Sequence, residues 1–265
     1  MEYDKAIVHP NAKIGANVKI SPFAIIDEHV EIGDNCVIGP FAHIMNYVKM
    51  GSNCMVGNGA VVGGLPQDLK FKGEVSYVEI GNNVRIGEFC TISRGTAASG
   101  KNVTKIGDNT FLMAYVHVAH DCVIGNHVIL VSYTGLAGEV EVSDWVTIGG
   151  ASVVHQFCRI GCHAMLSGAS IVGKDIPPFA LAGNRPINFA GLNRVGLKRR
   201  GFTDEQMNRI WDVYRVIYQS GLNPTAACKK AQAELPDSEE KKIVLDFFES
   251  SQRGVVRFGR SLGEG

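Results

Sequence analysis

The chain has 265 residues, of which 45% are hydrophobic and 20% charged, a composition typical of a folded globular protein. Its 26 acidic and 26 basic residues balance, so no overall field favours nucleic acid or a membrane surface. No segment approaches the roughly 20 apolar residues of a membrane-spanning helix, and the first ten residues do not read as a signal peptide, so we expect a cytoplasmic protein without a membrane span.

A branched aliphatic residue or methionine recurs at every sixth position from Val8 to Val62, and again from Ile80 to Ile92. Neither a helix nor a lone strand fixes every sixth residue, whereas short strands joined by regular corners do, so the repeat predicts a parallel β-helix of stacked coils. The pattern resembles the hexapeptide-repeat family of left-handed β-helices. That resemblance implies the left hand and a triangular coil of three hexapeptides.

Two side-chain types keep the same register. Asparagine, which tolerates the positive φ of a corner, follows the aliphatic position by three residues at Asn17, Asn35, Asn53, Asn83 and Asn109. Cysteine precedes the aliphatic position by two residues at Cys36, Cys54, Cys90, Cys122 and Cys158. The shared register predicts cysteines packed inside the coils rather than metal ligands.

Two insertions interrupt the repeat, at residues 63–78 and 94–105. Loops on a rigid scaffold commonly carry function, so Asp68 and Lys70 of the first insertion are candidate site residues, against the alternative of an ordinary charged loop. The second insertion, "RGTAASGKNVTK", is rich in small residues and is interpreted as an arm or a lid.

The repeat resumes from Ile106 to Val172 and brings unlike polar groups into one column. With 18 residues in a coil, the residues around Val118, Leu136 and Val154 stack about one strand spacing, ~4.8 Å, apart. They are His117, His120, Gly138, Glu139, His155 and Gln156. We interpret this column as a functional site rather than a solvated edge of the β-helix. The nearby "GASIVGKD" lacks the Ser or Thr of a phosphate-binding loop and is discarded.

After the repeat the pattern becomes helical, which divides the chain into a β-helix over 1–190 and an α-helical domain over 191–265. Thr203 and Gln206 form a capping box for a helix that runs to about Gln219. Asn223 opens a second helix, and "SEEKKIVLDFFES" predicts a third. The basic residues Lys198, Arg199 and Arg200, at the entrance to this domain, are either a solvated basic segment or an anion site.

Four motifs, "PQDLKF", "HVAHDC", "VVHQFC" and "GLKRRGF", together resemble the UDP-N-acetylglucosamine O-acyltransferases that begin lipid A synthesis. The resemblance covers the whole chain. It implies transfer of an (R)-3-hydroxyacyl group from acyl carrier protein to the sugar 3-hydroxyl by a homotrimer with sites between subunits. It also implies no metal and no separate cofactor, because phosphopantetheine arrives on the carrier protein.

By this resemblance His120 is the general base, and the backbone amide of Gly138 holds the oxyanion. The resemblance further implies two groups of substrate contacts. Those near the sugar are Gln67, Asp68, Lys70 and His117, and those near the nucleotide, its diphosphate or the pantetheine are His155, Gln156, Asn193, Arg199 and Arg200.

Three further positions bear on specificity. Glu139 stands where many family members have His, which leaves open whether the sugar carries oxygen or nitrogen at position 3. Val195 stands where many have Glu, which loosens the assignment of nucleotide contacts. Gly168 matches the position that gauges acyl length and suggests a deep channel and a longer chain.

Three other functions were weighed. The related N-acyltransferase of the same pathway would carry an extra N-terminal domain, whereas the repeats here begin by Val8. A zinc carbonic anhydrase on the same helix would use His117, His120 and His127, but the four motifs and the C-terminal helices argue against it. A structural or ice-binding solenoid would present repetitive Thr or Ser arrays, which this column is not.

Overall fold

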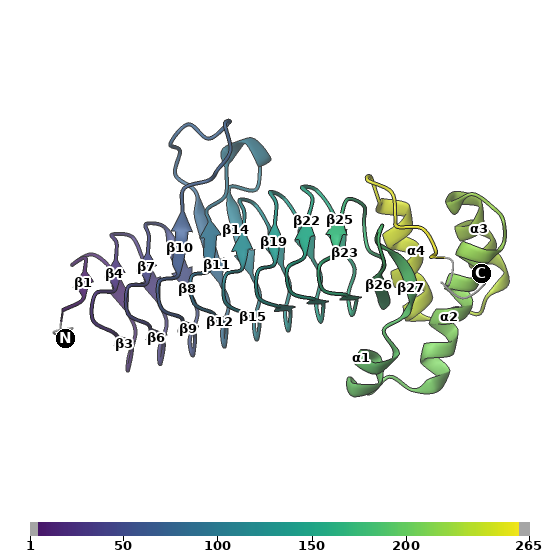
Figure 1. The fold of residues 1–265 in the computed structure, drawn as a ribbon, viewed down its shortest axis with the longest axis horizontal. Coiled ribbons are helices and arrows are strands. Elements are labelled where there is room, and N and C mark those ends of the chain that lie inside the picture. The colour runs from purple at the N-terminus through teal and green to yellow at the C-terminus, as the bar shows by residue number, and fades with distance from the viewer. Residues whose placement is uncertain (1–4, 260–265) are drawn as a thin grey trace.

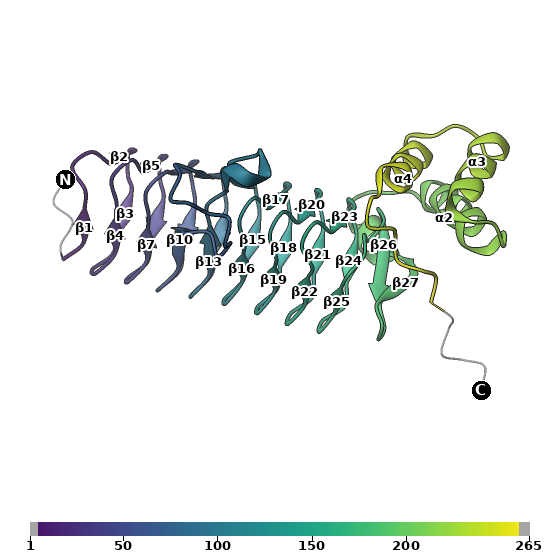
Figure 2. The same ribbon diagram turned by 90° about the horizontal axis from the view of Figure 1, so that it is seen from above.

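A computed structural model describes residues 5–259 as a row of triangular coils that ends in a group of helices (Figures 1 and 2). The N-terminus lies at one end of the row and the helices α2, α3 and α4 at the other. Within residues 5–259, no helix combines the length and apolarity needed to cross a membrane.

Three sheets form the faces of the β-helix, and nearly all their strand pairs are parallel and one coil apart. The first sheet contains β1 (Ile7–Val8), β4 (Ile25–Ile26), β7 (His43–Ile44), β10 (Val61–Gly64), β13 (Thr91–Ser93), β16 (His117–Val118), β19 (Gly135–Leu136), β22 (Val153–Val154) and β25 (Ile171–Val172). The second contains β2 (Lys13–Ile14), β5 (Glu31–Ile32), β8 (Val48–Met50), β11 (Tyr77–Ile80), β14 (Val103–Ile106), β17 (Val123–Ile124), β20 (Glu141–Val142) and β23 (Arg159–Ile160). The third contains β3 (Lys19–Ile20), β6 (Val37–Ile38), β9 (Met55–Val56), β12 (Arg85–Ile86), β15 (Phe111–Leu112), β18 (Ile129–Leu130), β21 (Thr147–Ile148), β24 (Met165–Leu166), β26 (Ala180–Gly183) and β27 (Asn188–Leu192).

Each coil turns at three corners, which we name by the sheets they join. The first corner joins the first and second sheets, the second corner joins the second and third, and the third corner leads back to the first sheet. One residue of most corners has a positive φ. The asparagines predicted to occupy corners do so at the second corner, with φ between 56° and 58° at Asn17, Asn35, Asn53, Asn83 and Asn109.

The aliphatic position of each hexapeptide points into the coil, and from Ile20 to Val172 every such residue is buried. The five cysteines that share one register are fully buried free thiols, which confirms their predicted packing role. Cys36 and Cys54 stack as expected, since the Cys54 backbone N–H donates to the Cys36 Sγ at 3.4 Å. Burial of this continuous aliphatic column holds the coils together, at roughly 1.5–3 kcal/mol for each large side chain.

The two insertions leave the β-helix side by side (Figure 1). Outside the strands they cover residues 65–76 and 94–102, and the second includes a short 3-10 helix, η1 (Ala97–Ser99). The Ala97 N–H donates to Glu74 Oε1 at 3.0 Å, and Asn102 Nδ2 donates to the Val75 carbonyl at 3.0 Å. The insertions are therefore tied to each other as well as to the β-helix. We name them the sugar loop (65–76) and the clamp loop (94–102), for reasons given below.

The last strands and the helices close the C-terminal end of the β-helix. β27 pairs antiparallel with β26 and leads into α1 (Arg194–Arg199), which was not predicted from the sequence. The three predicted helices are present as α2 (Asp204–Gln219), α3 (Pro224–Glu234) and α4 (Glu239–Ser250). The Thr203–Gln206 capping box and the Asn223 cap both form as expected.

Candidate active site

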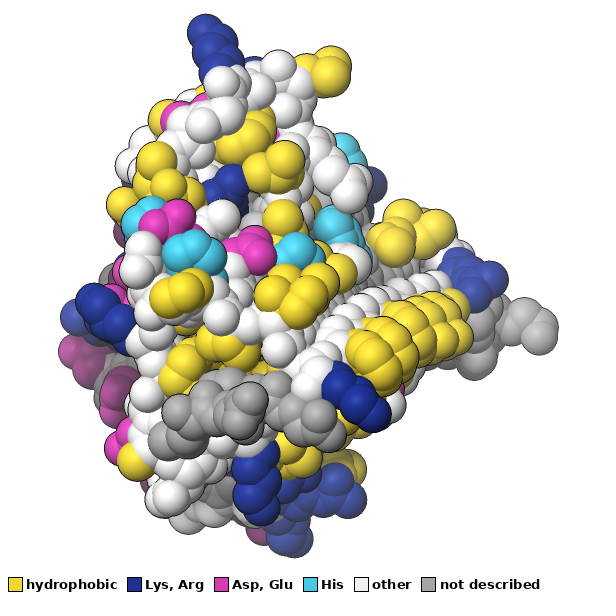
Figure 3. All heavy atoms as spheres, turned by 90° about the vertical axis from the view of Figure 1, so that its left-hand side faces the viewer, with side chains coloured by type: hydrophobic (Ala, Val, Ile, Leu, Met, Phe, Trp, Pro, Cys, Tyr) yellow, Lys and Arg dark blue, Asp and Glu magenta, His cyan; other side chains and the backbone are white. Residues whose placement is uncertain are grey.

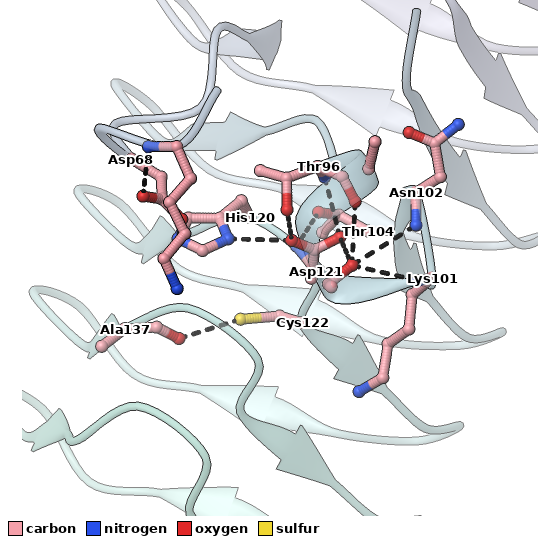
Figure 4. Close-up of polar contacts among 12 residues, drawn as sticks. Asp68, Thr96, Lys101, Asn102, Thr104, His120, Asp121, Cys122 and Ala137 are labelled. Atoms are coloured by element: carbon pink, nitrogen blue, oxygen red, sulfur yellow. Dashed lines mark hydrogen bonds and ion pairs between the residues drawn. The ribbon is translucent and has the colours of Figure 1, made fainter. Parts of the chain in front are cut away.

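The site is built around the turn of the first corner that follows β16. His120 and Asp121 are the two turn residues, and Asp121 has a φ of 61°. His120 Nδ1 lies 2.9 Å from Asp121 Oδ2, so this ring nitrogen donates to the carboxylate when it carries the proton (Figure 4). The other ring nitrogen, Nε2, is then the acceptor of a neutral imidazole.

Asp121 is completely buried, yet both of its carboxylate oxygens have partners. Oδ1 accepts from the Thr96 backbone N–H at 2.9 Å and from the Ser99 hydroxyl at 2.7 Å. Oδ2 accepts from the Thr96 hydroxyl at 2.7 Å as well as from His120. Four donors thus match the roughly four acceptor sites of a carboxylate, which is the condition for burying one.

The sugar loop covers the opposite side of the His120 ring. Asp68 Oδ2 lies 3.7 Å from His120 Nε2, and Asp68 Oδ1 accepts from the Lys70 backbone N–H at 2.9 Å (Figure 4). Gln67 and the Lys70 side chain are exposed to solvent. Of the predicted loop residues, Asp68 therefore meets the predicted base, with its carboxylate facing the nitrogen that is free to accept a proton.

Gly138 lies one coil beyond His120, and the two residues are in contact. A Cβ atom added to Gly138 would lie 2.5 Å from His120 Nε2, so no side chain fits there without moving the imidazole. The Gly138 carbonyl accepts from Phe157, but its own N–H has no hydrogen-bond acceptor among residues 5–259. An unpaired amide beside the base is a ready donor for a developing oxyanion.

His117 precedes the turn on β16 and is half-buried. Its Nδ1 lies 2.7 Å from the Thr91 hydroxyl of the preceding coil. Burial, followed by repulsion from the charge of His120, lowers the pKa of His117 below its ordinary value. This ring is therefore neutral at cellular pH and acts through hydrogen bonds rather than charge.

The rest of the predicted column lies at the same corner on the following coils. Glu139 follows Gly138, has a φ of 61° and is half-buried. His155 and Gln156 occupy the next coil and are exposed, with His155 Nδ1 3.1 Å from the Gln156 carbonyl. These six residues, one on β16 and the others in or beside three successive turns, thus line one edge of the β-helix, as the 18-residue stacking predicted.

Three predicted residues lie elsewhere in the chain, at the second corner and α1. Asn193 is buried, caps α1 by accepting from Gly196 N–H, and donates to the His163 carbonyl at 2.9 Å. The Arg200 guanidinium lies 5.4 Å from the Trp145 ring centroid and 3.4 Å from His163 Nδ1, and burial lowers its pKa. Arg199 and Val195 are exposed on α1. We call Arg199 and Arg200 the basic group. Within one chain, this basic group and the His120 corner are on different edges of the prism.

Two other sequence expectations concern positions away from His120. Gly168 lies at the third corner, where an added Cβ would approach the Gly150 carbonyl oxygen to 3.2 Å. His127, weighed as a zinc ligand, stacks on Trp145 at the second corner with a centroid separation of 3.9 Å. Among residues 5–259, no three His, Cys, Asp or Glu side chains are grouped so as to hold a metal ion.

Sequence reasoning assigned no role to Asp121, Thr96 or Ser99, although Asp121 directly follows the predicted base. Its position carried a signal: an aspartate took the positive-φ corner position immediately after a histidine. Thr96 and Ser99 carried none, because their contact with Asp121 spans 25 and 22 residues across the insertion.

Comparison with known proteins places this geometry among acyltransferases. A family model for bacterial transferase hexapeptides, of six repeats, matches residues 29–64 and 104–138, and a model for domain 2 of UDP-N-acetylglucosamine O-acyltransferases matches residues 175–256. Two similar relatives, both named acyl-[acyl-carrier-protein]–UDP-N-acetylglucosamine O-acyltransferase, come from Thiobacillus denitrificans and Burkholderia mallei. The first is 46% identical over 95% of this chain and 97% of its own, and the second is 45% identical over 75% and 77%.

Solved structures agree. The UDP-N-acetylglucosamine acyltransferase LpxA of Bacteroides fragilis superposes with a TM-score of 0.94 at 47% identity, covering 97% of this chain and all of its own. LpxA of Acinetobacter baumannii gives a TM-score of 0.93 at 37% identity, covering 96% and 98%. The left-handed β-helix with a C-terminal helical region, predicted from the repeat and its resemblance, is confirmed.

Proposed function

Because this chain belongs to the family of acyl-[acyl-carrier-protein]–UDP-N-acetylglucosamine O-acyltransferases, we propose that it acylates the 3-hydroxyl of UDP-N-acetylglucosamine with an (R)-3-hydroxyacyl group from acyl carrier protein, the first step of lipid A biosynthesis. One observation carries the proposal: the His120 ring hydrogen-bonds to the buried Asp121 carboxylate and lies against Gly138, whose N–H has no acceptor among residues 5–259. One corner thus supplies a base, an anchor for it and a donor for an oxyanion.

His120 is the general base in this proposal, and Nε2 is the atom that accepts the proton. Asp121 holds the proton on Nδ1, which fixes the tautomer and leaves the Nε2 lone pair directed at the sugar loop. Nε2 removes the proton of the sugar 3-hydroxyl while that oxygen attacks the thioester carbonyl carbon. The imidazolium formed in this step is stabilised by the adjacent carboxylate.

Collapse of the intermediate completes the transfer. Attack on the carbonyl carbon leaves a negative charge on the former carbonyl oxygen, and the free Gly138 N–H is the donor for it. When the carbon–sulfur bond breaks, the leaving sulfur takes the proton from His120 and departs as the pantetheine thiol. The histidine returns to its neutral state and the acyl group stays on the sugar oxygen.

The sugar binds between the sugar loop and the column. Asp68 accepts hydrogen bonds from sugar donors beside Nε2, and Gln67 and Lys70 reach the ligand from the exposed part of the loop. His117 contributes a neutral ring held by Thr91. Glu139 lies directly after the oxyanion donor and can accept from a donor at sugar position 3 or its neighbours.

The nucleotide site is shared between two chains. His155 and Gln156 extend the His120 column, whereas the basic group lies on another edge of the same prism. Within one chain, Arg199 and Arg200 therefore lie away from a diphosphate bound at this column. In a trimer the partner subunit's Arg200, Arg199 and Asn193 provide that charge and the contacts to nucleotide and pantetheine.

Exposed aromatic side chains support assembly into a homotrimer. Stacked rings line the third corner, and they are 47–65% exposed: Phe23, Phe41, Phe89, Tyr115 and Tyr133. Figure 3, which views the molecule from its N-terminal end, likewise shows hydrophobic side chains exposed in rows along the prism. Contiguous exposed apolar surface of this kind marks a protein–protein interface.

The remaining expectations complete the proposal. The enzyme needs no metal or separate cofactor, since the phosphopantetheine belongs to the carrier-protein substrate, and Gly168 limits the acyl length from within the assembled trimer. All seven cysteines are free thiols, in keeping with a reducing compartment such as the cytoplasm.

An assay of purified protein tests the proposal. The protein is incubated with UDP-N-acetylglucosamine, or its 3-amino analogue, and a series of acyl-carrier-protein thioesters, and products are identified by mass spectrometry. We expect one acyl group on the sugar and a preferred chain length. Thioester hydrolysis without sugar acylation would contradict the proposal, and acylation of the amino analogue alone would correct it to N-acylation.

A further inference from the structure

The clamp loop reaches the most deeply buried charge beside the active site. Three of the four donors to the Asp121 carboxylate come from this loop: the Thr96 N–H, the Thr96 hydroxyl and the Ser99 hydroxyl (Figure 4). The fourth donor is His120. No other residue among 5–259 hydrogen-bonds to the carboxylate, so apart from His120 the clamp loop supplies every donor that holds it.

The packing around this contact leaves little freedom for Asp121. Its backbone N–H donates to the Thr104 hydroxyl at 2.8 Å, on the strand where the clamp loop returns to the β-helix. At the other end of the loop, a Cβ added to Gly95 would meet the Val103 backbone nitrogen first and would also lie 2.7 Å from Asp121 Oδ1. Gly95 therefore permits the close approach of backbone to carboxylate that the three hydrogen bonds require.

The clamp loop is itself fastened to the loop that carries Asp68. Glu74 accepts from Ala97 N–H at the start of η1, and this hydrogen bond is the main cause that lowers the pKa of Glu74. Asn102 donates to the Val75 carbonyl at the other end. The two sides of the His120 ring, Asp121 and Asp68, are thus connected through the same pair of insertions.

We infer that Thr96 and Ser99 are positioning residues for acyl transfer, and that the clamp loop is part of the catalytic machinery rather than a lid or a passive insertion. The inference rests on the proposed function. The two hydroxyls and one amide hold the carboxylate, the carboxylate holds the Nδ1 proton, and the ring is thereby presented with Nε2 toward the sugar. Neither residue touches the substrate.

Matched substitutions at Thr96 separate the hydroxyl from the side-chain volume. Thr96→Val keeps the shape but leaves Asp121 Oδ2 without one donor, and we expect kcat to fall about 10- to 100-fold, the scale of a misplaced catalytic group, with KM for UDP-N-acetylglucosamine unchanged. Thr96→Ser keeps the hydroxyl and should retain most of kcat. Ser99→Ala should lower kcat in the same way, because Oδ1 then keeps only the Thr96 amide.

Thr134→Val is the control for loss of a buried hydroxyl. Thr134 is fully buried at the third corner, whereas Asp121 lies at the first, and its hydroxyl donates to the Val131 carbonyl at 2.6 Å. We expect this variant to keep kcat even where it loses as much thermal stability as Thr96→Val. Equal losses of kcat in both valine variants would assign Thr96 a merely structural role.

A readout independent of turnover completes the test. In ¹⁵N-histidine NMR of the trimer, the Nδ1–H tautomer of His120 should dominate in the wild-type protein and in Thr96→Ser, and should give way to a tautomer mixture in Thr96→Val. Wild-type kcat in Thr96→Val, with an unchanged tautomer, would overturn the inference while leaving acyl transfer in place. Absence of acyl transfer in the wild-type protein would instead overturn the proposed function, and the NMR comparison would still decide the positioning role.

Discussion

Single residues define the chemistry of this site, and Gly138 is the most constrained of them. Its lack of a side chain allows the His120 ring to lie directly against it, and its N–H has no acceptor among residues 5–259. A histidine column alone would be a solvated edge. In the proposed mechanism, the glycine makes it a base next to an oxyanion donor.

Gly138→Ala should therefore inactivate the enzyme by displacing His120 rather than by unfolding the coil. The added methyl group would meet Nε2 at 2.5 Å, and the imidazole must rotate away. We expect kcat to fall about 100-fold or more, the scale of a lost oxyanion donor or a misplaced base. Circular dichroism and thermal unfolding should change little. A variant with wild-type kcat would show that neither the amide nor the ring position matters for transfer.

His163 gives the protein a pH-dependent stability. Burial, with the nearby charge of Arg200 as the second cause, lowers the pKa of His163 from 6.5 to about 4 in the folded state. The neutral ring accepts from Arg200 and stacks on Phe179, so its stabilising effect is complete above pH 6.5 and is lost as the pH falls toward 4, because the unfolded chain binds the proton first.

His163→Gln should accordingly flatten the acidic side of the stability profile. Thermal unfolding of wild-type and variant proteins is compared at equal concentration from pH 7.5 to pH 4.5. The wild-type protein should lose more stability over this range than the variant does. Parallel profiles would mean that His163 titrates normally in the folded protein.

At the scale of elements, the helices at the C-terminal end depend on specific caps. One of these is Lys241 of α4, which caps the C-terminal end of α3. Lys241 is 3% exposed in side chain, and its ammonium group donates to the Leu235 carbonyl at 2.8 Å and the Gln232 carbonyl at 3.3 Å, at the end of α3. Asp237 lies 2.7 Å from the same nitrogen. One buried cation thus satisfies carbonyls that the end of a helix leaves unpaired.

Lys241→Met should destabilise the helical domain while leaving the β-helix intact. Methionine keeps most of the volume but leaves those carbonyls without a donor, at a cost of about 1–3 kcal/mol in the free energy of unfolding. Hydrogen exchange should increase in α3 and α4 and stay low in the coils. If hydrogen exchange in α3 stays at the wild-type rate, the Lys241 ammonium group does not stabilise the C-terminal end of that helix.

The elements differ in how far their structure could be predicted from the sequence, and the insertions mark the limit. Repeats, corners and capped helices follow from short-range spacing, so the aliphatic register, Asn17 and its equivalents, and the Thr203 cap were all predictable. The clamp loop changes the spacing between stacked coils, with Thr91 paired to His117 across 26 residues, and no local pattern predicts where Thr96 will point. α1 was not predicted because it has only six residues. Its N-cap, Asn193, also donates to the His163 carbonyl, a contact that no local pattern indicates.

At the scale of the whole molecule, one prism carries two separate groups of predicted site residues. The first corner holds His120, Gly138, His155 and Gln156, and the second corner with α1 holds Arg200 and Asn193. The sequence predicted both sets by resemblance, yet only the three-dimensional arrangement separates them. In the proposed cyclic trimer, the first corner of one chain meets the basic group of the next.

Mixed trimers test this sharing. His120→Ala and Arg200→Ala chains, each expected to be inactive alone, are unfolded together and refolded as a mixture. Every mixed trimer then contains one site with both wild-type residues, and random assembly should restore about a quarter of wild-type activity. No restoration from mixed trimers that form in the expected proportions would mean that each chain builds its own site.

The most direct test of the account is the rate of acyl transfer by His120→Ala, measured with saturating UDP-N-acetylglucosamine and acyl carrier protein thioester on a trimer of confirmed mass and fold. Loss of the base should lower kcat by about 10²- to 10⁴-fold or more while UDP-N-acetylglucosamine still binds. A rate within a few-fold of the wild-type enzyme would contradict the assignment of His120, and with it the roles given to Asp121 and Gly138.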